Sequence, residues 1–167
     1  LHIQLARILD VKKIIATDVN EYRMNAAKKF GADEVINAKE DVPTSLKEVN
    51  EGRLADRVIV STGALPAIKQ SLKCVDRGGT ILFFAPTEPE IEISLPFNEF
   101  WTSQLILTNT YAAAPADIKE AIELIRSNKV NVHDMITHRL SLIETGKGLQ
   151  LVVDAKESIK VIIEPYR

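Results

Sequence analysis

Short apolar runs alternate with amphipathic stretches along most of the 167 residues. The apolar runs have the length of strands and few polar interruptions, which is typical of strands buried on both faces of a parallel sheet. They predict strands at Ile14–Thr17, Glu34–Ile36, Arg57–Ser61, Thr80–Ala85, Leu105–Thr110 and Ile159–Ile163. Met135–Leu142 is predicted to be extended. The amphipathic stretches predict helices at Leu1–Leu9, Glu21–Phe30, Pro43–Val49, Leu65–Cys74, Pro96–Ser103 and Pro115–Arg126, and a last one through Val153. This alternation predicts an α/β fold with a doubly wound, mostly parallel sheet.

Several local signals set the expected boundaries. Asn20 has a side chain that favours the N-cap position, and Gly31 is the residue expected directly after the end of this helix. Asp76-Arg77-Gly78-Gly79 predicts a turn, and Ser141-x-x-Glu144 predicts a capping box. Ile91–Leu95 alternates apolar and polar residues, as a half-exposed edge strand does.

Composition narrows the function classes. Apolar residues make up 46% of the chain, enough for the core of one domain. Twenty-one basic and 23 acidic residues give a net charge of −2, which favours neither a nucleic-acid nor a membrane partner. Cys74 is the single cysteine, so no disulfide forms within these residues. With no recognisable secretory signal in the sequence, a reducing cytoplasm is the expected location.

Asp18 is the first candidate for chemistry. It follows an apolar, β-branched run and precedes a helix, the place where dinucleotide-binding folds hold the ribose of adenosine. Its carboxylate would accept hydrogen bonds from both ribose hydroxyls and repel a 2′-phosphate. Asp18 could equally cap the following turn, as aspartates often do. The local pattern leaves these two interpretations open.

Several short motifs occur together in the order typical of one enzyme family. They are Asp18-x-x-x-x-Arg23, Ala27-Lys28-x-x-Gly31-Ala32-Asp33, Ser61-Thr62-Gly63 with Ala67-Ile68, Gly78-Gly79, Ile136-Thr137-His138-Arg139-Leu140 and Ile159-Lys160-Val161. On these residues the chain resembles the coenzyme-binding domain and C-terminal segment of the medium-chain, zinc-containing alcohol and polyol dehydrogenases. The resemblance implies a Rossmann-type domain over residues 1–167 that binds NAD. It also implies a parent enzyme that transfers hydride between the cofactor and a secondary alcohol or polyol, assisted by zinc.

The resemblance also implies a role for individual residues. Asp18 and Arg23 would bind the adenosine ribose, and Lys160 would lie near the pyrophosphate. Thr62 and Gly63 would lie beside the adenine and its ribose. The residues expected to line the nicotinamide are Phe84, Ala85, Pro86, Asn109, Thr110 and Tyr111. Most of these residues lie at or just after the carboxyl ends of predicted strands, where ligands of open α/β sheets bind. No catalytic residue is expected in this chain.

Two features of the family are not found in the sequence. The Gly-rich turn that cradles the pyrophosphate is missing, and so is the N-terminal catalytic domain that carries the zinc ligands. We therefore expect a segment of a longer polypeptide, whose preceding residues supply the first, central strand of the sheet. His2, His133 and His138 lack the spacing of zinc ligands, so zinc is expected outside this chain.

Two other function classes remain open. An S-adenosylmethionine methyltransferase also holds a ribose with an acidic residue after its second strand, and a nucleotide-sensing module could use a Rossmann domain without catalysing a reaction.

A homodimer or homotetramer is expected through the Ile91–Leu95 edge strand, since exposed edges favour pairing. The sequence does not indicate which alcohol or polyol would be the substrate.

Overall fold

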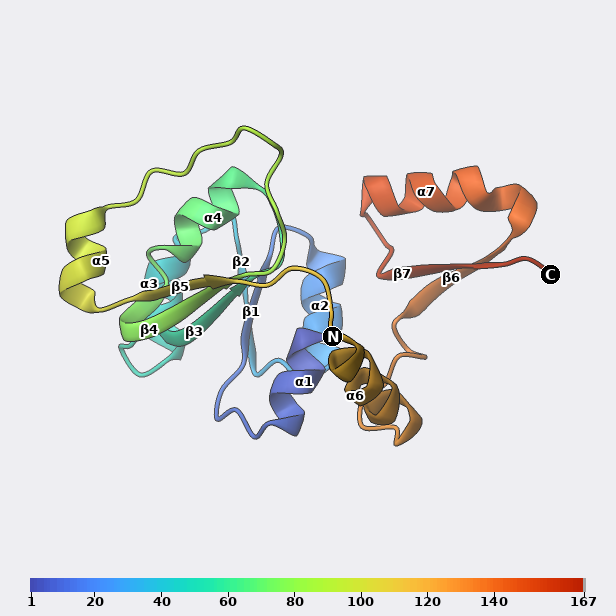
Figure 1. Cartoon of the computed structure of the whole chain (residues 1–167), viewed down its shortest axis with the longest axis horizontal. Helices are drawn as coiled ribbons and strands as arrows, with labels where there is room; N and C mark the ends of the chain where they lie inside the picture. The colour runs from blue at the N-terminus through green and yellow to red at the C-terminus, as the bar shows by residue number, and fades with distance from the viewer. Residues whose placement is uncertain (167) are drawn as a thin grey trace. The chain divides into compact units, whose positions relative to one another are not determined.

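All strand pairs in the described part of the chain are parallel. The structure, a computed structural model, describes residues 1–166, and Figure 1 shows their helices and strands. The strands pair in three sheets, β1–β2, β3–β4–β5 and β6–β7. These residues divide into two compact units, residues 38–112 and residues 1–37 with 113–166. The α/β class and the parallel pairing are confirmed, whereas a single domain over the whole chain stays a prediction.

The unit of residues 38–112 contains the three-stranded sheet. Its elements are α3 (Val42–Val49), β3 (Ala55–Val60), α4 (Leu65–Ser71), β4 (Val75–Phe83), α5 (Phe97–Ser103) and β5 (Ile106–Asn109). Figure 1 shows β3, β4 and β5 side by side, and α4 contacts β3. Val60, Ile68, Val75 and Ile81 form the buried core between the sheet and α4. The β-branched residues that predict the strands therefore fill the core.

The other unit contains two strand pairs. Its first part consists of α1 (His2–Ile8), β1 (Ile15–Asp18), α2 (Glu21–Lys29) and β2 (Glu34–Asn37), with α2 against both strands. Its second part consists of α6 (Pro115–Arg126), β6 (Ile136–Ser141), a 3₁₀ turn at Leu142–Glu144, α7 (Thr145–Asp154) and β7 (Lys160–Glu164). α7 lies along β6 and β7 (Figure 1).

The predicted helix ends are confirmed by hydrogen bonds. Asn20 caps α2, because its side-chain oxygen accepts the Arg23 N–H. The N–H groups of Gly31 and Ala32 donate to the carbonyls of Lys28 and Ala27, the pattern of a Schellman motif. Gly31 adopts φ +106° there, which other residues rarely do.

The predicted capping box is confirmed as well. Ser141 donates to Glu144 through both its backbone N–H (3.1 Å) and its hydroxyl (2.9 Å). These bonds stabilise the charged carboxylate, which lowers the pKa of Glu144. The sequence signal therefore marks the true start of the last helical segment.

The turn predicted at Asp76–Gly79 is wrong as a strand boundary. These residues belong to β4, which begins at Val75. The pairing of β4 with β3 shifts here: Val75 lies opposite Ala55 but Thr80 opposite Arg57. The extra residues of β4 form a bulge, and Gly78 has φ +70° within it. Turn residues therefore occur inside the strand because a bulge needs the same backbone conformations.

The edge strand predicted at Ile91–Leu95 is also wrong for the described chain. These residues are irregular and belong to no sheet. Of the three alternating apolar side chains, Ile93 packs against the core, while Ile91 and Leu95 are each 42% exposed. Alternation describes which side chains face a core, but a strand also needs a partner for its backbone groups.

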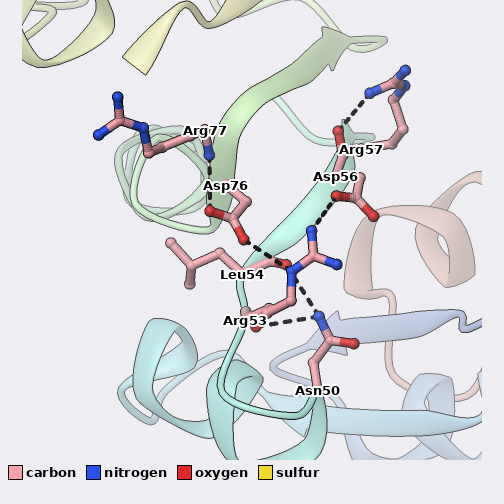
Figure 2. Close-up of polar contacts among 7 residues, drawn as sticks. All are labelled: Asn50, Arg53, Leu54, Asp56, Arg57, Asp76 and Arg77. Atoms are coloured by element: carbon pink, nitrogen blue, oxygen red, sulfur yellow. Dashed lines mark hydrogen bonds and ion pairs between the residues drawn. The ribbon is translucent and has the colours of Figure 1, made fainter. Parts of the chain in front are cut away.

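A polar network holds the amino ends of β3 and β4 together (Figure 2). Arg53 donates to Asp56 (2.9 Å) and pairs with Asp76 (3.5 Å), the first residue of the bulge. The Asn50 amide, at the end of α3, donates to the carbonyls of Arg53 and Leu54 at 3.2 and 3.0 Å. This network keeps the bulge of β4 next to the start of β3.

None of the helices in residues 1–166 combines the length and the apolar character that crossing a lipid bilayer requires. The cytoplasmic location expected from the sequence stays a prediction.

Candidate cofactor site

Asp18 ends β1 and is half-buried at the carboxyl end of the strand. Its Oδ1 accepts the backbone N–H of Asn20 at 2.9 Å, so the carboxylate closes the turn that leads into α2. In the described residues this is the hydrogen bond that the carboxylate accepts. The capping role that the sequence left open is therefore present, and it occupies one of the two oxygens. The geometry leaves the other oxygen able to accept hydrogen bonds from a ligand.

Arg23 and Lys160 lie in the same unit as Asp18. Arg23 is half-buried in the first turn of α2, five residues after Asp18. Lys160 is the first residue of β7 and is exposed, opposite Ile136 of β6. Both are cations that could contact the anionic groups of a dinucleotide.

The remaining candidate residues meet at one edge of the three-stranded sheet. Val60, Phe83 and Asn109 are in register, and all three strands end there. The segments that follow, Ser61–Gly63, Phe84–Pro86 and Thr110–Tyr111, therefore leave the sheet at the same edge. The N–H groups of Phe84 and Ala85 both donate to the Val60 carbonyl, at 3.0 and 3.3 Å, which holds the first two segments side by side.

Gly63 is in very close contact with the neighbouring segment. A Cβ atom at this position would lie 2.1 Å from the Pro86 carbonyl oxygen and 3.1 Å from its carbon. Real side chains do not tolerate such distances, so the backbone of Pro86 occupies the space that a side chain would need. The approach of these two segments depends on glycine.

Side chains at this edge are open to solvent. Thr62 accepts the Ala64 N–H at 3.2 Å, and its hydroxyl proton can still be donated to a ligand. Phe84 is 49% exposed and Tyr111 is 99% exposed. Exposed aromatic rings beside backbone and hydroxyl groups suit a flat, partly polar ring system such as a nicotinamide or an adenine.

The pKa values of Asp33 and Cys74 are also shifted, and both shifts have structural causes. The Ile14 N–H donates to the Asp33 carboxylate at 2.7 Å, and the Arg7 guanidinium also contacts it, so the pKa of Asp33 is lowered. Burial raises the pKa of the Cys74 thiol to about 11, which makes it a poor nucleophile. Within residues 1–166, no three His, Cys, Asp or Glu side chains are grouped so that they could hold a metal ion.

Residues 1–127 match the family model described as zinc-binding dehydrogenase. The chain belongs to the zinc-binding dehydrogenase family. It is 30% identical over 169 residues to a sorbitol dehydrogenase of Bacillus subtilis, covering 97% of this chain and 46% of that protein. It is 29% identical over 150 residues to a sorbitol dehydrogenase of Halalkalibacterium halodurans, covering 87% of this chain and 42% of that protein. The chain thus spans slightly less than half the length of these curated relatives.

Solved structures confirm the fold. Benzyl alcohol dehydrogenase from Acinetobacter calcoaceticus superimposes with a TM-score of 0.88 at 21% identity, over 96% of this chain and 45% of that one. A zinc-binding dehydrogenase from Sinorhizobium meliloti, bound to NADP, gives 0.87 at 20% identity, over 98% of this chain and 48% of that one. The membership confirms the predicted dehydrogenase family and favours it over the methyltransferase and nucleotide-sensing alternatives.

The sequence did not indicate two contacts. Asn20 was predicted as a helix cap, but its side-chain amide also donates to the carbonyls of Ala155 and Lys156, more than 130 residues away. The contact of Gly63 with Pro86 was equally hidden. Both join segments distant in sequence, and no local pattern records the distant partner.

Proposed function

We propose that the protein containing this chain is an NAD-dependent oxidoreductase that transfers hydride between a secondary alcohol or polyol and the cofactor. Asp18 is the observation that carries the proposal. It stands at the carboxyl end of β1 with one oxygen held by Asn20 and the other available for a ribose hydroxyl. The family membership and the two sorbitol dehydrogenases support the reaction class.

The proposal includes a preference for NAD over NADP. A carboxylate accepts hydrogen bonds from free hydroxyls and repels a phosphate. The Sinorhizobium meliloti structure with the same fold is bound to NADP, so the preference proposed for this chain is argued from the Asp18 side chain and not from the fold. Val19 and Asn20 follow Asp18 and bring no positive charge, although Arg23 lies nearby.

In this proposal the other candidate residues have the roles that the family resemblance implies. Arg23 would lie beside the adenosine ribose, and Lys160 would neutralise the pyrophosphate. Thr62 and Gly63 would contact the adenine half. Phe84, Ala85, Pro86, Asn109, Thr110 and Tyr111 would pack against the nicotinamide.

Zinc, when bound, would polarise the oxygen of the alcohol. Residues 1–166 contain no group of three His, Cys, Asp or Glu side chains placed as metal ligands, and we propose that the zinc binds elsewhere in the protein.

The test is a titration of both cofactors against the intact protein and its Asp18→Ser variant. We expect NAD to bind the wild type more tightly than NADP, and Asp18→Ser to weaken NAD and reduce the preference. Asp41→Ser is a matched control, because it removes the same charge from a residue of the other unit. Asp41 caps α3 there by accepting hydrogen bonds from Thr44. Equal or tighter binding of NADP to the wild type would contradict the proposal.

We also propose that two copies pair through residues 91–95. Supporting this, Ile91 and Leu95 are exposed, and the backbone of this segment belongs to no sheet in the described chain. Trp101, 72% exposed on the helix that follows, would lie near the contact. Leu95→Lys should shift the protein toward monomer in sedimentation, without disturbing the Ile93 contact with the core. An unchanged mass would place any interface elsewhere.

A further inference from the structure

Asn20 uses every hydrogen-bonding group of its side chain. The amide nitrogen donates to the carbonyls of Ala155 and Lys156, both at 2.8 Å. The amide oxygen accepts the Arg23 N–H at 3.3 Å and so caps α2. Its two amide protons and its oxygen are all engaged, so the side chain cannot rotate without losing all three bonds.

The backbone N–H of the same residue donates to Asp18 Oδ1 at 2.9 Å. The turn between β1 and α2 is thus attached to the segment between α7 and β7. Ala155 ends α7 with a φ angle of +51°. Its carbonyl is one of the two that accept hydrogen bonds from the Asn20 amide. The orientation of the Asp18 carboxylate depends on where this turn places the N–H of Asn20.

We infer that Asn20 is a positioning residue for cofactor binding: its amide, held by the carbonyls of Ala155 and Lys156, fixes the turn that orients Asp18 toward the ribose. This inference rests on the proposed function, because it needs Asp18 to contact the ribose. It assigns the C-terminal segment a part in choosing the cofactor, through a contact about 135 residues away in sequence. Asn20 itself need not touch the ligand.

An ordinary helix cap is the competing explanation. A cap stabilises α2 whatever Asp18 does, and it requires only the side-chain oxygen. Asn20→Ser would provide a hydroxyl oxygen that can cap the helix and would keep the backbone N–H, but it would remove both amide donors. Alanine would remove the cap as well. Comparing the two variants separates the attachment to residues 155 and 156 from the cap.

The experiment measures NAD and NADP dissociation constants and thermal unfolding for the intact protein with Asn20→Ser, Asn20→Ala and Asp18→Ser, and with the double variant of Asn20→Ser and Asp18→Ser. We expect Asn20→Ser to weaken NAD about fivefold and leave NADP nearly unchanged, since coupled neighbours of this kind typically show such effects. On the Asp18→Ser background the same change should have no further effect on NAD. This loss of effect is what a purely structural role would not produce.

Asn50 provides a matched control. Its amide also donates to two backbone carbonyls, those of Arg53 and Leu54, in the other unit (Figure 2). Asn50→Ser should lower the melting temperature but leave the ratio of the two cofactor affinities unchanged.

The outcomes distinguish the two proposals. If the wild type does not prefer NAD, or Asp18→Ser leaves NAD binding unchanged, the proposed function fails and this inference fails with it. If Asp18→Ser weakens NAD but Asn20→Ser does not, or if the two changes add in the double variant, the inference alone is overturned. Should Asn20→Ala not fold, Asn20→Ser, which keeps the cap, carries the comparison.

Discussion

The two ends of the three-stranded sheet are built from different contacts. At the amino end, Arg53 pairs with Asp56 and Asp76, so the charged side chains satisfy one another (Figure 2). At the carboxyl end, the backbones of Gly63 and Pro86 are in close contact, while Thr62 and Tyr111 are exposed. One end uses its polar groups for the fold, and the other keeps side chains available for a ligand.

The same contrast holds among carboxylates of the other unit. Asp33 receives the Ile14 N–H and the Arg7 guanidinium, and its charge is committed to the fold. Asp18 receives only the Asn20 N–H in the described residues. A carboxylate that is incompletely paired, at the end of a parallel strand, is the better candidate for a ligand. The two carboxylates therefore differ in how far their neighbours engage them, which is why Asp18 and not Asp33 is proposed to contact the ribose.

Gly63→Ala should give the largest loss. The new Cβ would overlap the Pro86 carbonyl, so the free energy of unfolding should fall by about 2–3 kcal/mol, as for other overpacked sites. Chemical denaturation measures the change. Gly146→Ala is the control: nothing lies within 4 Å of its added Cβ, and removing a helical glycine should stabilise by up to about 1 kcal/mol. A Gly63→Ala protein as stable as the wild type would mean that the two segments do not touch.

Asp33→Asn should lower the free energy of unfolding, because the Asp33 carboxylate is engaged by both the Ile14 N–H and Arg7. The loss at neutral pH should be about 1 kcal/mol, because the hydrogen bonds are charge-assisted but the side chain is partly exposed. The Ile14 N–H and Arg7 lower the pKa of Asp33, so its contribution is complete above the usual carboxyl value of about 4. It is lost as the pH falls from there through the folded-state pKa. Urea unfolding at several pH values should therefore show that the difference in free energy of unfolding between wild type and variant becomes smaller in acid. A difference that does not change with pH would contradict this.

Arg53→Met tests the network at the amino end. Both partners are lost, but the side chains of Arg53 and Asp56 are mostly exposed, so we expect a loss of about 0.5 kcal/mol. Added salt should reduce the difference, since it screens exposed charges. Arg57→Met is the matched control, because Arg57 donates to the carbonyl of its neighbour Asp56 and should matter less. A larger loss for Arg57→Met would mean that the network does not hold this end of the sheet.

Tyr111→Ala should have the smallest effect on stability and so sharpens the contrast between the two ends. The side chain is 99% exposed, and the free energy of unfolding should stay within about 0.5 kcal/mol of the wild type. If the carboxyl end binds the nicotinamide, NAD affinity should nevertheless fall. Denaturation and NAD titration on the same preparation measure both quantities. Unchanged affinity would remove Tyr111 from the proposed site.

Local patterns predicted most of the elements because they depend on neighbours in sequence. The helix expected to begin near Pro115 and to run through Arg126 spans Pro115–Arg126. Asn20, Gly31 and Ser141 with Glu144 act at the predicted helix ends. Capping and β-branched runs stabilise a few residues at a time, so a single sequence carries that information. The motif around Asp18 likewise points to the family, because its residues lie close together in the sequence.

Contacts between distant segments could not be predicted in this way. The irregular Ile91–Leu95 segment shows that alternation does not supply a strand partner, and the bulge at Asp76–Gly79 shows that turn residues also serve inside a strand. The contact of Gly63 with Pro86 and the bonds from Asn20 to Ala155 and Lys156 exist only once the chain has folded. The sequence by itself determined most of the helices and strands, the signals at several helix ends and which carboxylate ends β1. Tertiary structure decided which of these groups are engaged by partners and which remain open, because engagement depends on residues that are close in space and far apart in the chain.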